Sequence, residues 1–222
     1  MEQESWGGRD KPGHDGRPMS GPTVVKLGGS FAFSPELRDW IKAIVVHAGR
    51  IVIVPGGGPF ADTVRTTQAQ MRFDNRTAHR MGLLAMEQYG CAIASMNKQL
   101  QLADSLEAIR HGLAGGKVPV WLPTQMVLAD TAIPQSWDVT SDSLAAWLAG
   151  RLGAERLVLL KHLESMESTV PASNLVASDM LDRAFVKFLT ASGVPGFILG
   201  PMEHGAIRSA ISDDAVYIRI IV

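Results

Sequence analysis

Short apolar runs alternate along the chain with longer segments whose apolar residues recur at helical spacing. Four of these runs, at residues 23–27, 50–54, 118–122 and 156–160, are too apolar for either face to contact water. Strands buried on both faces are typical of parallel sheets that are covered by helices. We therefore predict an α/β fold, a three-layer α/β/α sandwich with a mainly parallel central sheet.

The remaining pattern supplies two more strands and two helical regions. Residues 197–200 and 215–221 are predicted to be the last strands of the chain. Residues 35–48 are predicted to form a helix, with proline in the first turn, where its missing N–H costs nothing. We expect residues 76–114 to be helical, as a hairpin of helices that covers a pocket or packs against a second subunit.

The first 22 residues differ in composition from the rest of the chain. They are rich in glycine, proline and charged residues and contain almost nothing that a core could bury. Such a composition is typical of disordered segments. We expect a disordered leader at residues 1–22 and one folded domain at residues 23–222, which is within the usual range of domain lengths.

The charge balance and the cysteine content limit which partners and which cellular compartment we expect for this protein. Lysine and arginine number 21 against 22 acidic residues, with no basic stripe, so nucleic acid is not an expected partner. No apolar run approaches the roughly 20 residues that span a bilayer, and the N-terminus lacks the apolar core of a signal peptide. Cys91 is the only cysteine, which suits a reducing cytoplasm, and we expect it to be a small buried residue.

Two glycine-rich turns each follow a predicted strand, at residues 28–30 and 56–58. Ligands of open α/β sheets bind beyond the carboxyl ends of the strands, where such turns lie. Glycine lets the backbone approach a ligand closely, and successive N–H groups can form an anion-binding nest. Neither turn matches the P-loop or the dinucleotide-binding pattern. The pair of turns indicates phosphate groups on both sides of a reaction.

Lys26 and Asp142 are the candidate charged groups of this site. Lys26 directly precedes the first glycine turn at the end of an apolar strand. A buried ammonium needs an acidic neighbour or an anionic ligand, although a lysine at a strand end can also extend to solvent. Asp142 opens a predicted helix together with Thr140 and Ser141, and all three are suited to cap that helix. Asp142 could in addition accept hydrogen bonds from Lys26, which would fix the lysine and keep it charged.

In order and spacing, three segments resemble the amino-acid-kinase superfamily, which includes acetylglutamate, uridylate, aspartate, carbamate and isopentenyl phosphate kinases. The segments are residues 25–30, 51–58 and 140–142. The resemblance implies that Lys26 stabilises the transferring phosphoryl group and that Asp142 organises this lysine. It further implies that Gly28, Gly29 and Ser30 bind ATP phosphates and that Gly56, Gly57, Gly58, Thr140 and Ser141 bind the acceptor. Mg²⁺ would arrive with the nucleotide, and the protein would form a homo-oligomer.

A closer resemblance is to the kinases of aminomethylfuran phosphates in methanofuran biosynthesis. It is carried by residues 55–61, by the segment around His79, and by residues 122–128 leading into Ser136 and Trp137. This resemblance implies that the acceptor is a phosphate monoester, [5-(aminomethyl)furan-3-yl]methyl phosphate, which is converted to its diphosphate for one-carbon metabolism. His79 would then contact the acceptor, whereas the alternative is a histidine on a helix surface.

The chain departs from the superfamily after its fourth main strand. The usual T-D-x-D-G nucleotide loop is replaced by residues 161–165, and no clear counterpart of the second catalytic lysine is present at residues 200–208. Lys161 is either a second phosphate-binding cation or an ordinary lysine at a strand end. Two alternatives to the proposed kinase follow: a non-catalytic nucleotide- or oxyanion-binding sensor, storage or scaffold protein, and a kinase of an amino acid or isoprenoid phosphate.

Overall fold

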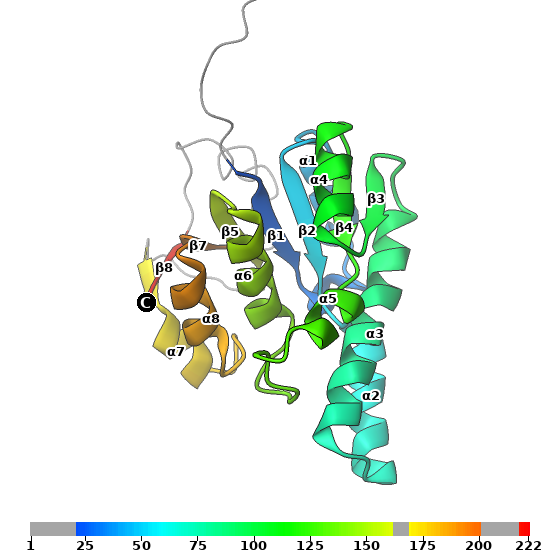
Figure 1. Cartoon of the computed structure of the whole chain (residues 1–222), viewed down its shortest axis with the longest axis vertical. Coiled ribbons are helices and arrows are strands. Elements are labelled where there is room, and N and C mark those ends of the chain that lie inside the picture. Colours follow the sequence, from blue (N-terminus) through cyan, green and yellow to red (C-terminus); the bar gives the residue numbers. More distant parts are fainter. Residues whose placement is uncertain (1–20, 162–168, 201–217) are drawn as a thin grey trace, which may run out of the picture.

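A computed structural model describes residues 21–161, 169–200 and 218–222. In these ranges an eight-stranded sheet with the order β3-β4-β2-β1-β5-β7-β8-β6 forms the centre (Figure 1). Neighbouring strands are parallel except for β7 and β8, which are antiparallel. The strands are β1 Thr23–Leu27, β2 Ile51–Pro55, β3 Leu100–Ala103, β4 Val118–Trp121, β5 Arg156–Leu160, β6 Thr169–Pro171, β7 Gly196–Leu199 and β8 Ile218–Ile221.

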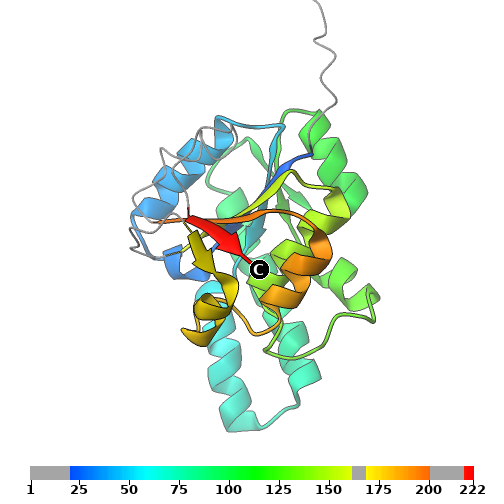
Figure 2. The ribbon, with the colours of Figure 1, turned by 90° about the vertical axis from the view of Figure 1, so that its left-hand side faces the viewer.

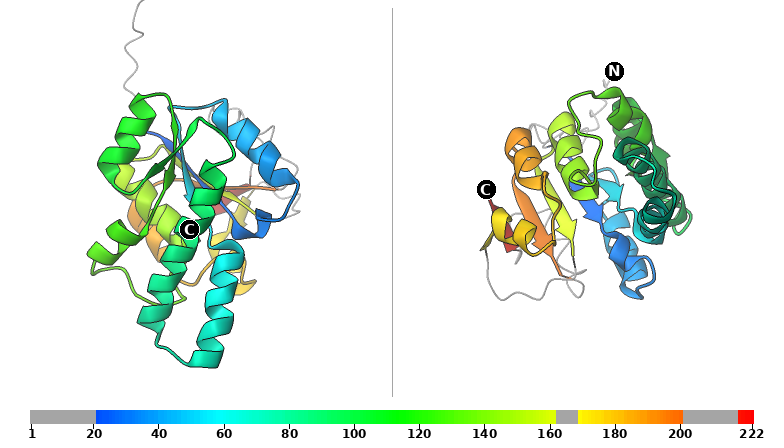
Figure 3. Two further views of the ribbon diagram at one scale, coloured as in Figure 1. Left: turned by 90° about the vertical axis from the view of Figure 1, so that its right-hand side faces the viewer. Right: turned by 90° about the horizontal axis from the view of Figure 1, so that it is seen from below.

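Helices cover both faces of the sheet, which confirms the predicted three-layer sandwich (Figures 2 and 3). The α-helices in the described ranges are α1 Glu36–Val45, α2 Gly58–Met71, α3 Asn75–Ala94, α4 Leu106–Ala114, α5 Thr124–Ala129, α6 Ser141–Leu152, α7 Ala172–Ala177 and α8 Phe185–Ser192. A short 3₁₀ helix, η1, spans Gly29–Phe31. None of the helices described is long and apolar enough to cross a membrane.

The central strands are apolar on both faces because each face packs against a different core. Val24 of β1 belongs to a cluster that also contains residues of α4, α6 and α8. Its neighbour Val25 points to the opposite face and joins a cluster with Trp40 of α1 and Ile93 of α3. Successive side chains of a strand alternate between faces, so a strand covered on both sides must be apolar throughout. The predicted burial of β1 is therefore confirmed by the packing.

The expectation of helix throughout residues 76–114 is wrong, because β3 separates α3 from α4. Strand β3 pairs in parallel with β4, for example Leu102 with Val120, and forms an edge of the sheet. Leu100 is buried, whereas the side chain of Leu102 is 40% exposed at the edge. A strand of four residues shows too little periodicity to be distinguished from a helix, so only pairing with β4 decides its conformation.

The outer segments agree with the prediction as far as they are described. Strand β1 begins at Thr23, while residues 1–20 of the predicted leader lie outside the described ranges. The last predicted strand appears as β8, and residues 215–217 also lie outside. Cys91 is exposed, contrary to expectation. The buried stripe of α3 runs through residues 83, 86, 90 and 93, and position 91 lies off that stripe.

Helices α2 and α3 form a hairpin that extends beyond the sheet on the side where β1 and β2 end (Figures 1 and 3). Helix α2 ends at Arg72, which adopts the left-handed conformation with φ 58°. The Asp74 side chain caps α3 by accepting a hydrogen bond from the backbone N–H of Thr77 at 2.7 Å. The hairpin thereby supplies a wall next to the glycine turns.

Candidate active site

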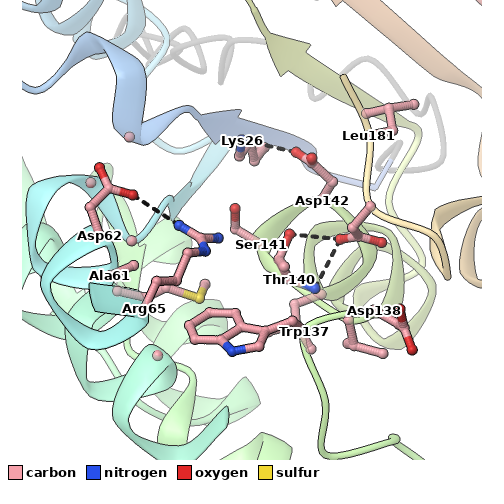
Figure 4. Close-up of a pocket in the computed structure, with 18 of the residues that line it drawn as sticks. Lys26, Ala61, Asp62, Arg65, Trp137, Asp138, Thr140, Ser141, Asp142 and Leu181 are labelled. Carbon is pink, nitrogen blue, oxygen red and sulfur yellow. Dashed lines mark hydrogen bonds and ion pairs between the residues drawn. The ribbon is translucent and has the colours of Figure 1, made fainter. Parts of the chain in front are cut away.

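A cavity of about 780 Å³ lies at the carboxyl ends of β1, β2 and β5. Its walls come from the two glycine turns, the first turn of α6, the α2–α3 hairpin and residues 179–183 (Figure 4). Strand β1 lies between β2 and β5, which are reached by connections on opposite sides of it. Ligands of α/β proteins bind at such switch points of the sheet. The cavity is therefore the candidate active site.

At the centre of this site one carboxylate joins two lysines. The ammonium of Lys26 lies 2.9 Å from Oδ1 of Asp142, so the ion pair suggested by the sequence is present. The ammonium of Lys161 lies 2.7 Å from Oδ2 of the same carboxylate. Lys161 follows β5, whose register places Leu159 beside Lys26. The geometry excludes the reading of Lys161 as an ordinary strand-end lysine, because its ammonium is turned into the site.

Burial and charge act together on the pKa values of this triad. Desolvation, aided by the charge of Lys161, outweighs the attraction of Asp142 and lowers the pKa of Lys26 from 10.5 to about 8. Burial opposes the ionisation of Asp142, but the two lysines outweigh this effect and hold the pKa of its carboxyl below the usual value. At neutral pH the carboxylate is thus ionised and Lys26 is protonated. Two cations with one carboxylate make this end of the cavity attractive to an anion.

The first turn of α6 is capped by Asp182, a residue that the sequence reasoning missed. Its Oδ2 accepts hydrogen bonds from the backbone N–H of Thr140 at 2.9 Å and from its hydroxyl at 2.8 Å. The same oxygen accepts from the backbone N–H of Ser143 at 3.0 Å, and Oδ1 accepts from the Ser143 hydroxyl. The Thr140 side chain makes no capping bond to the helix, so the expectation of a local cap is wrong. No local pattern could have identified a partner 42 residues away.

The glycines bring the two turns into direct contact. A Cβ atom on Gly29 would lie 2.3 Å from the backbone nitrogen of Gly58, and one on Gly56 would lie 2.5 Å from that of Gly29. Such contacts do not occur between real atoms, so these positions require glycine. Gly29, Ser30, Gly57 and Gly58 line the cavity, whereas Gly28 and Gly56 are not among its wall residues. A Cβ on Gly28 would lie 3.2 Å from the carbonyl oxygen of Leu160, a tight contact, and 3.6 Å from the Lys26 ammonium, an ordinary one.

The wall opposite Lys26 combines an aromatic ring with a guanidinium. The indole N–H of Trp137 donates to Oε1 of Gln68 at 2.7 Å, which fixes the ring. The guanidinium carbon of Arg65 lies 4.6 Å from the centre of that ring, and its Nη1 lies 2.9 Å from Oδ1 of Asp62. Figure 4 shows Arg65 between Asp62 and Trp137, extending toward Ser141. Arg65 was not among the predicted site residues, although helical spacing from the second glycine turn could have indicated it.

His79 is a wall residue of the cavity and is buried, with 4% of its surface exposed. The alternative of a histidine on a helix surface is therefore wrong. Its Nδ1 lies 3.2 Å from the carbonyl oxygen of Ser136. Desolvation lowers the pKa of His79, which favours the neutral ring with Nδ1–H donating to that carbonyl. The Nε2 atom has no hydrogen-bond partner among the described residues. Contact between His79 and an acceptor stays a prediction.

Most of the predicted site residues line this one cavity. Lys26, Asp142 and Lys161 form the triad, and Thr140, Ser141, His79 and the wall glycines line the same cavity. Residues 162–165 and 201–208, where the chain departs from the superfamily pattern, lie outside the described ranges. Among the residues that are described, no group of three or more histidine, cysteine, aspartate or glutamate side chains could hold a metal ion.

Comparison with known proteins identifies the family. The sequence model of the amino acid kinase family matches residues 21–165, which include β1 to β5 and every charged residue of the triad. The chain belongs to the amino acid kinase family.

Individual members of the amino acid kinase family are distant relatives. The chain is 25% identical over 172 residues to [5-(aminomethyl)furan-3-yl]methyl phosphate kinase of Methanocaldococcus jannaschii, covering 76% of this chain and 77% of that protein. It is 24% identical over 249 residues to acetylglutamate kinase of Haemophilus ducreyi, covering 86% and 87%. The crystal structure of uridylate kinase from Archaeoglobus fulgidus superposes with a TM-score of 0.69 at 17% identity, covering 90% of this chain and all of that one. The structural likeness establishes the fold, and the relatives are all phosphotransferases.

Proposed function

We propose that this member of the amino acid kinase family transfers the γ-phosphoryl group of ATP to a small phosphate monoester. The observation that carries the proposal is the Lys26–Asp142–Lys161 triad at the head of the cavity. A carboxylate shared by two ammoniums orients both of them toward one anionic group. The glycine turns, with Gly29, Gly57 and Gly58 in the cavity wall, support binding of phosphates beside the triad.

In the proposed step, an oxygen of the acceptor's phosphate attacks the γ-phosphorus of ATP. The bond from this phosphorus to the β–γ bridging oxygen breaks, and ADP leaves with the electron pair. Charge in such a transition state is spread over the equatorial oxygens, so positioning and electrostatic stabilisation supply the catalysis. We assign the stabilisation to the ammoniums of Lys26 and Lys161, and their orientation to Asp142.

We expect Mg²⁺ to bind at this site together with the nucleotide. Magnesium is usually bound through one or two carboxylates and substrate phosphates and keeps several waters. The described residues hold no cluster of carboxylates that would bind it without the nucleotide. When bound, it would neutralise charge on the β- and γ-phosphates, while Gly28, Gly29 and Ser30 hold the nucleotide side.

For the acceptor we propose [5-(aminomethyl)furan-3-yl]methyl phosphate, converted to its diphosphate in methanofuran-type cofactor biosynthesis. The relative from Methanocaldococcus jannaschii supports this choice. The wall opposite Lys26 suits such a molecule, because Arg65 provides a guanidinium for a phosphate and Trp137 an aromatic surface for a furan ring. Gly56, Gly57, Gly58, Thr140, Ser141 and His79 would complete the acceptor side.

We also propose that the protein acts in the cytoplasm as a homo-oligomer, with one domain beginning at residue 23. Leu84 of α3, Met96 shortly after the end of α3 and Leu102 of the edge strand β3 are exposed apolar side chains, which supports a contact with a second copy. The mass of the protein in solution, measured by light scattering after size exclusion, tests the oligomeric state.

The test of the proposed function is ADP release from Mg-ATP with the aminomethylfuran phosphate as acceptor. UMP and N-acetylglutamate serve as competing acceptors, and Lys26→Met and a reaction without acceptor serve as controls. Turnover that requires the furan phosphate and is lost in Lys26→Met supports the proposal. Turnover with another acceptor refutes the proposed substrate. No turnover, together with protection of the protein by ATP against heat, favours a nucleotide-binding member without activity.

A further inference from the structure

Residues 179–184, here called the strap, connect α7 to α8 and lie across the end of the cavity that holds the triad. The strap makes hydrogen bonds at two points, one with Lys161 of the triad and one with the first turn of α6. The carbonyl oxygen of Met180 accepts a hydrogen bond from the Lys161 ammonium at 2.6 Å. Two residues further on, Asp182 accepts from both Thr140 and Ser143 in the first turn of α6.

These two contacts hold both ends of the Asp142–Lys161 pair. Asp142 lies between the two residues that Asp182 binds, so its position depends on that turn. The first N–H groups of a helix have no partner within the helix, and a capping side chain keeps the first turn ordered. Here the cap comes from the strap, since the Thr140 side chain does not provide it. The Met180 carbonyl restrains Lys161 from the opposite side.

Asp182 is a half-buried side chain beside α6. Burial raises its pKa, with the nearby charge of Asp142 as a further cause. Its hydrogen bonds from Ser143 and Thr140 act in the opposite sense, favouring the ionised form. Asp182 therefore acts on the triad through the hydrogen bonds that hold the first turn of α6.

We propose that Asp182 is a positioning residue of the kinase, which sets the place of Asp142, and through it the orientation of the two lysine ammoniums, by holding the first turn of α6. This proposal rests on the proposed function of the triad. A displacement of a reacting group by ~1 Å can reduce the rate of catalysis by roughly 100-fold, so the position of Asp142 matters more for turnover than for ATP binding.

The charge of Asp182 acts in a setting of several other ionisable groups. Asp142 lies on α6 and Lys161 follows β5, and both contact the region around Lys26. Other charged or titratable side chains in the cavity wall are Asp62 and Arg65 of α2, His79 of α3, Asp138 before α6, and Asp179 and Arg183 of the strap. None of these side chains bonds to the turn that carries Asp142, as Asp182 does. Because the charge of Asp142 raises the pKa of Lys26, release of that turn should lower the pKa of Lys26 further.

The experiment compares the full-length protein with Asp182→Asn, Asp182→Glu and a matched control, Asp130→Asn. Asp130 also holds α6, because its Oδ2 accepts from the indole N–H of Trp147 at 3.0 Å, but it is not a wall residue of the cavity. For each protein, kcat and the KM for ATP are measured across pH, beside the free energy of unfolding in urea. We expect Asp182→Asn to lower kcat by about 10-fold or more with little change in the KM for ATP.

The pH profile distinguishes positioning from general destabilisation. In Asp182→Asn the fall of kcat at high pH should begin at a pH lower by roughly half a unit or more. The reason is that a displaced Asp142 carboxylate attracts the Lys26 ammonium less, and this attraction raises the pKa of Lys26. Asp182→Glu keeps the charge and should restore that limb, and Asp130→Asn should leave both kcat and the limb unchanged. Equal losses of stability and kcat in Asp182→Asn and Asp130→Asn, with no movement of the limb, would overturn the proposal, as would wild-type kcat in Asp182→Asn.

A measurement without turnover separates this proposal from the proposed function. The Lys26 ammonium can be titrated by NMR of lysine-labelled protein, with Lys26→Met assigning the signal. A lower Lys26 pKa in Asp182→Asn than in wild type and Asp130→Asn supports the positioning of Asp142 by Asp182, even for a protein that does not turn over. An unchanged Lys26 pKa in Asp182→Asn refutes it, whatever the wild-type activity is.

Discussion

Lys26→Met should stabilise the protein at neutral pH while abolishing phosphoryl transfer. The substitution keeps the length of the side chain and removes its charge. Lys26 is buried, and its ammonium loses more by desolvation than it gains from Asp142. Asp142 would retain Lys161 at 2.7 Å, so the variant leaves no unpaired buried carboxylate. An active-site charge that costs stability is a known trade-off between stability and activity.

The size of the effect follows from the pKa of Lys26, which is about 8 in the folded protein against 10.5 for a free side chain. That difference corresponds to about 3 kcal/mol, because one pKa unit is worth about 1.4 kcal/mol. Below pH 8 Lys26 is protonated in both states, and the full cost is present in the folded protein. Between pH 8 and 10.5 the unfolded chain holds the proton and the folded chain does not, so the stability of the wild type rises with pH. Lys26→Met should therefore be more stable by up to about 3 kcal/mol at pH 7 and nearly equal by pH 10.5.

The assay is urea unfolding of the wild type and Lys26→Met at pH 7, 8, 9 and 10. Titrations of other groups affect both proteins alike and largely cancel in the difference between the two free energies of unfolding. A difference that is constant over this range would refute the reasoning, because it would mean that folding does not lower the pKa of Lys26.

Three further predictions concern activity and the glycine turns. The kcat of the wild type should fall as pH rises above about 8, where Lys26 loses its proton, and a profile that is flat to pH 10 would contradict this role for Lys26. Arg65→Ala should raise the KM for a phosphate acceptor by about 10-fold or more through loss of a charge-assisted hydrogen bond, with the KM for ATP unchanged. Equal increases in the KM for the acceptor and the KM for ATP would mean that Arg65 does not bind the acceptor specifically. Gly29→Ala should lower the free energy of unfolding by about 2 kcal/mol or more, because its Cβ would meet the backbone of Gly58. Wild-type stability of this variant in urea would show that the two turns can separate without cost.

Much of the architecture follows from local pattern. The apolar runs predicted β1, β2, β4 and β5 to within a residue or two, because a strand covered on both faces is apolar at most positions. Local pattern also predicted that Lys26 lies near the end of a strand and Asp142 at the start of a helix. In the structure Lys26 is in β1 and Asp142 is in the first turn of α6. Reasoning from local pattern failed for β3, because a strand of four residues shows no distinctive period. Its conformation is decided by pairing with β4 at the sheet edge.

By itself, the sequence determined which residue types lie at the ends of the strands, because strand and turn propensities act over a few neighbouring residues. Only the tertiary structure decided which of these groups meet. Lys161 pairs with Asp142 because β1 lies next to β5, and Asp182 caps α6 because the strap crosses the end of the cavity. The lowered pKa of Lys26 likewise depends on burial by segments distant in sequence. Ion pairs and desolvation depend on distance in space, and no pattern of neighbouring residues specifies that distance.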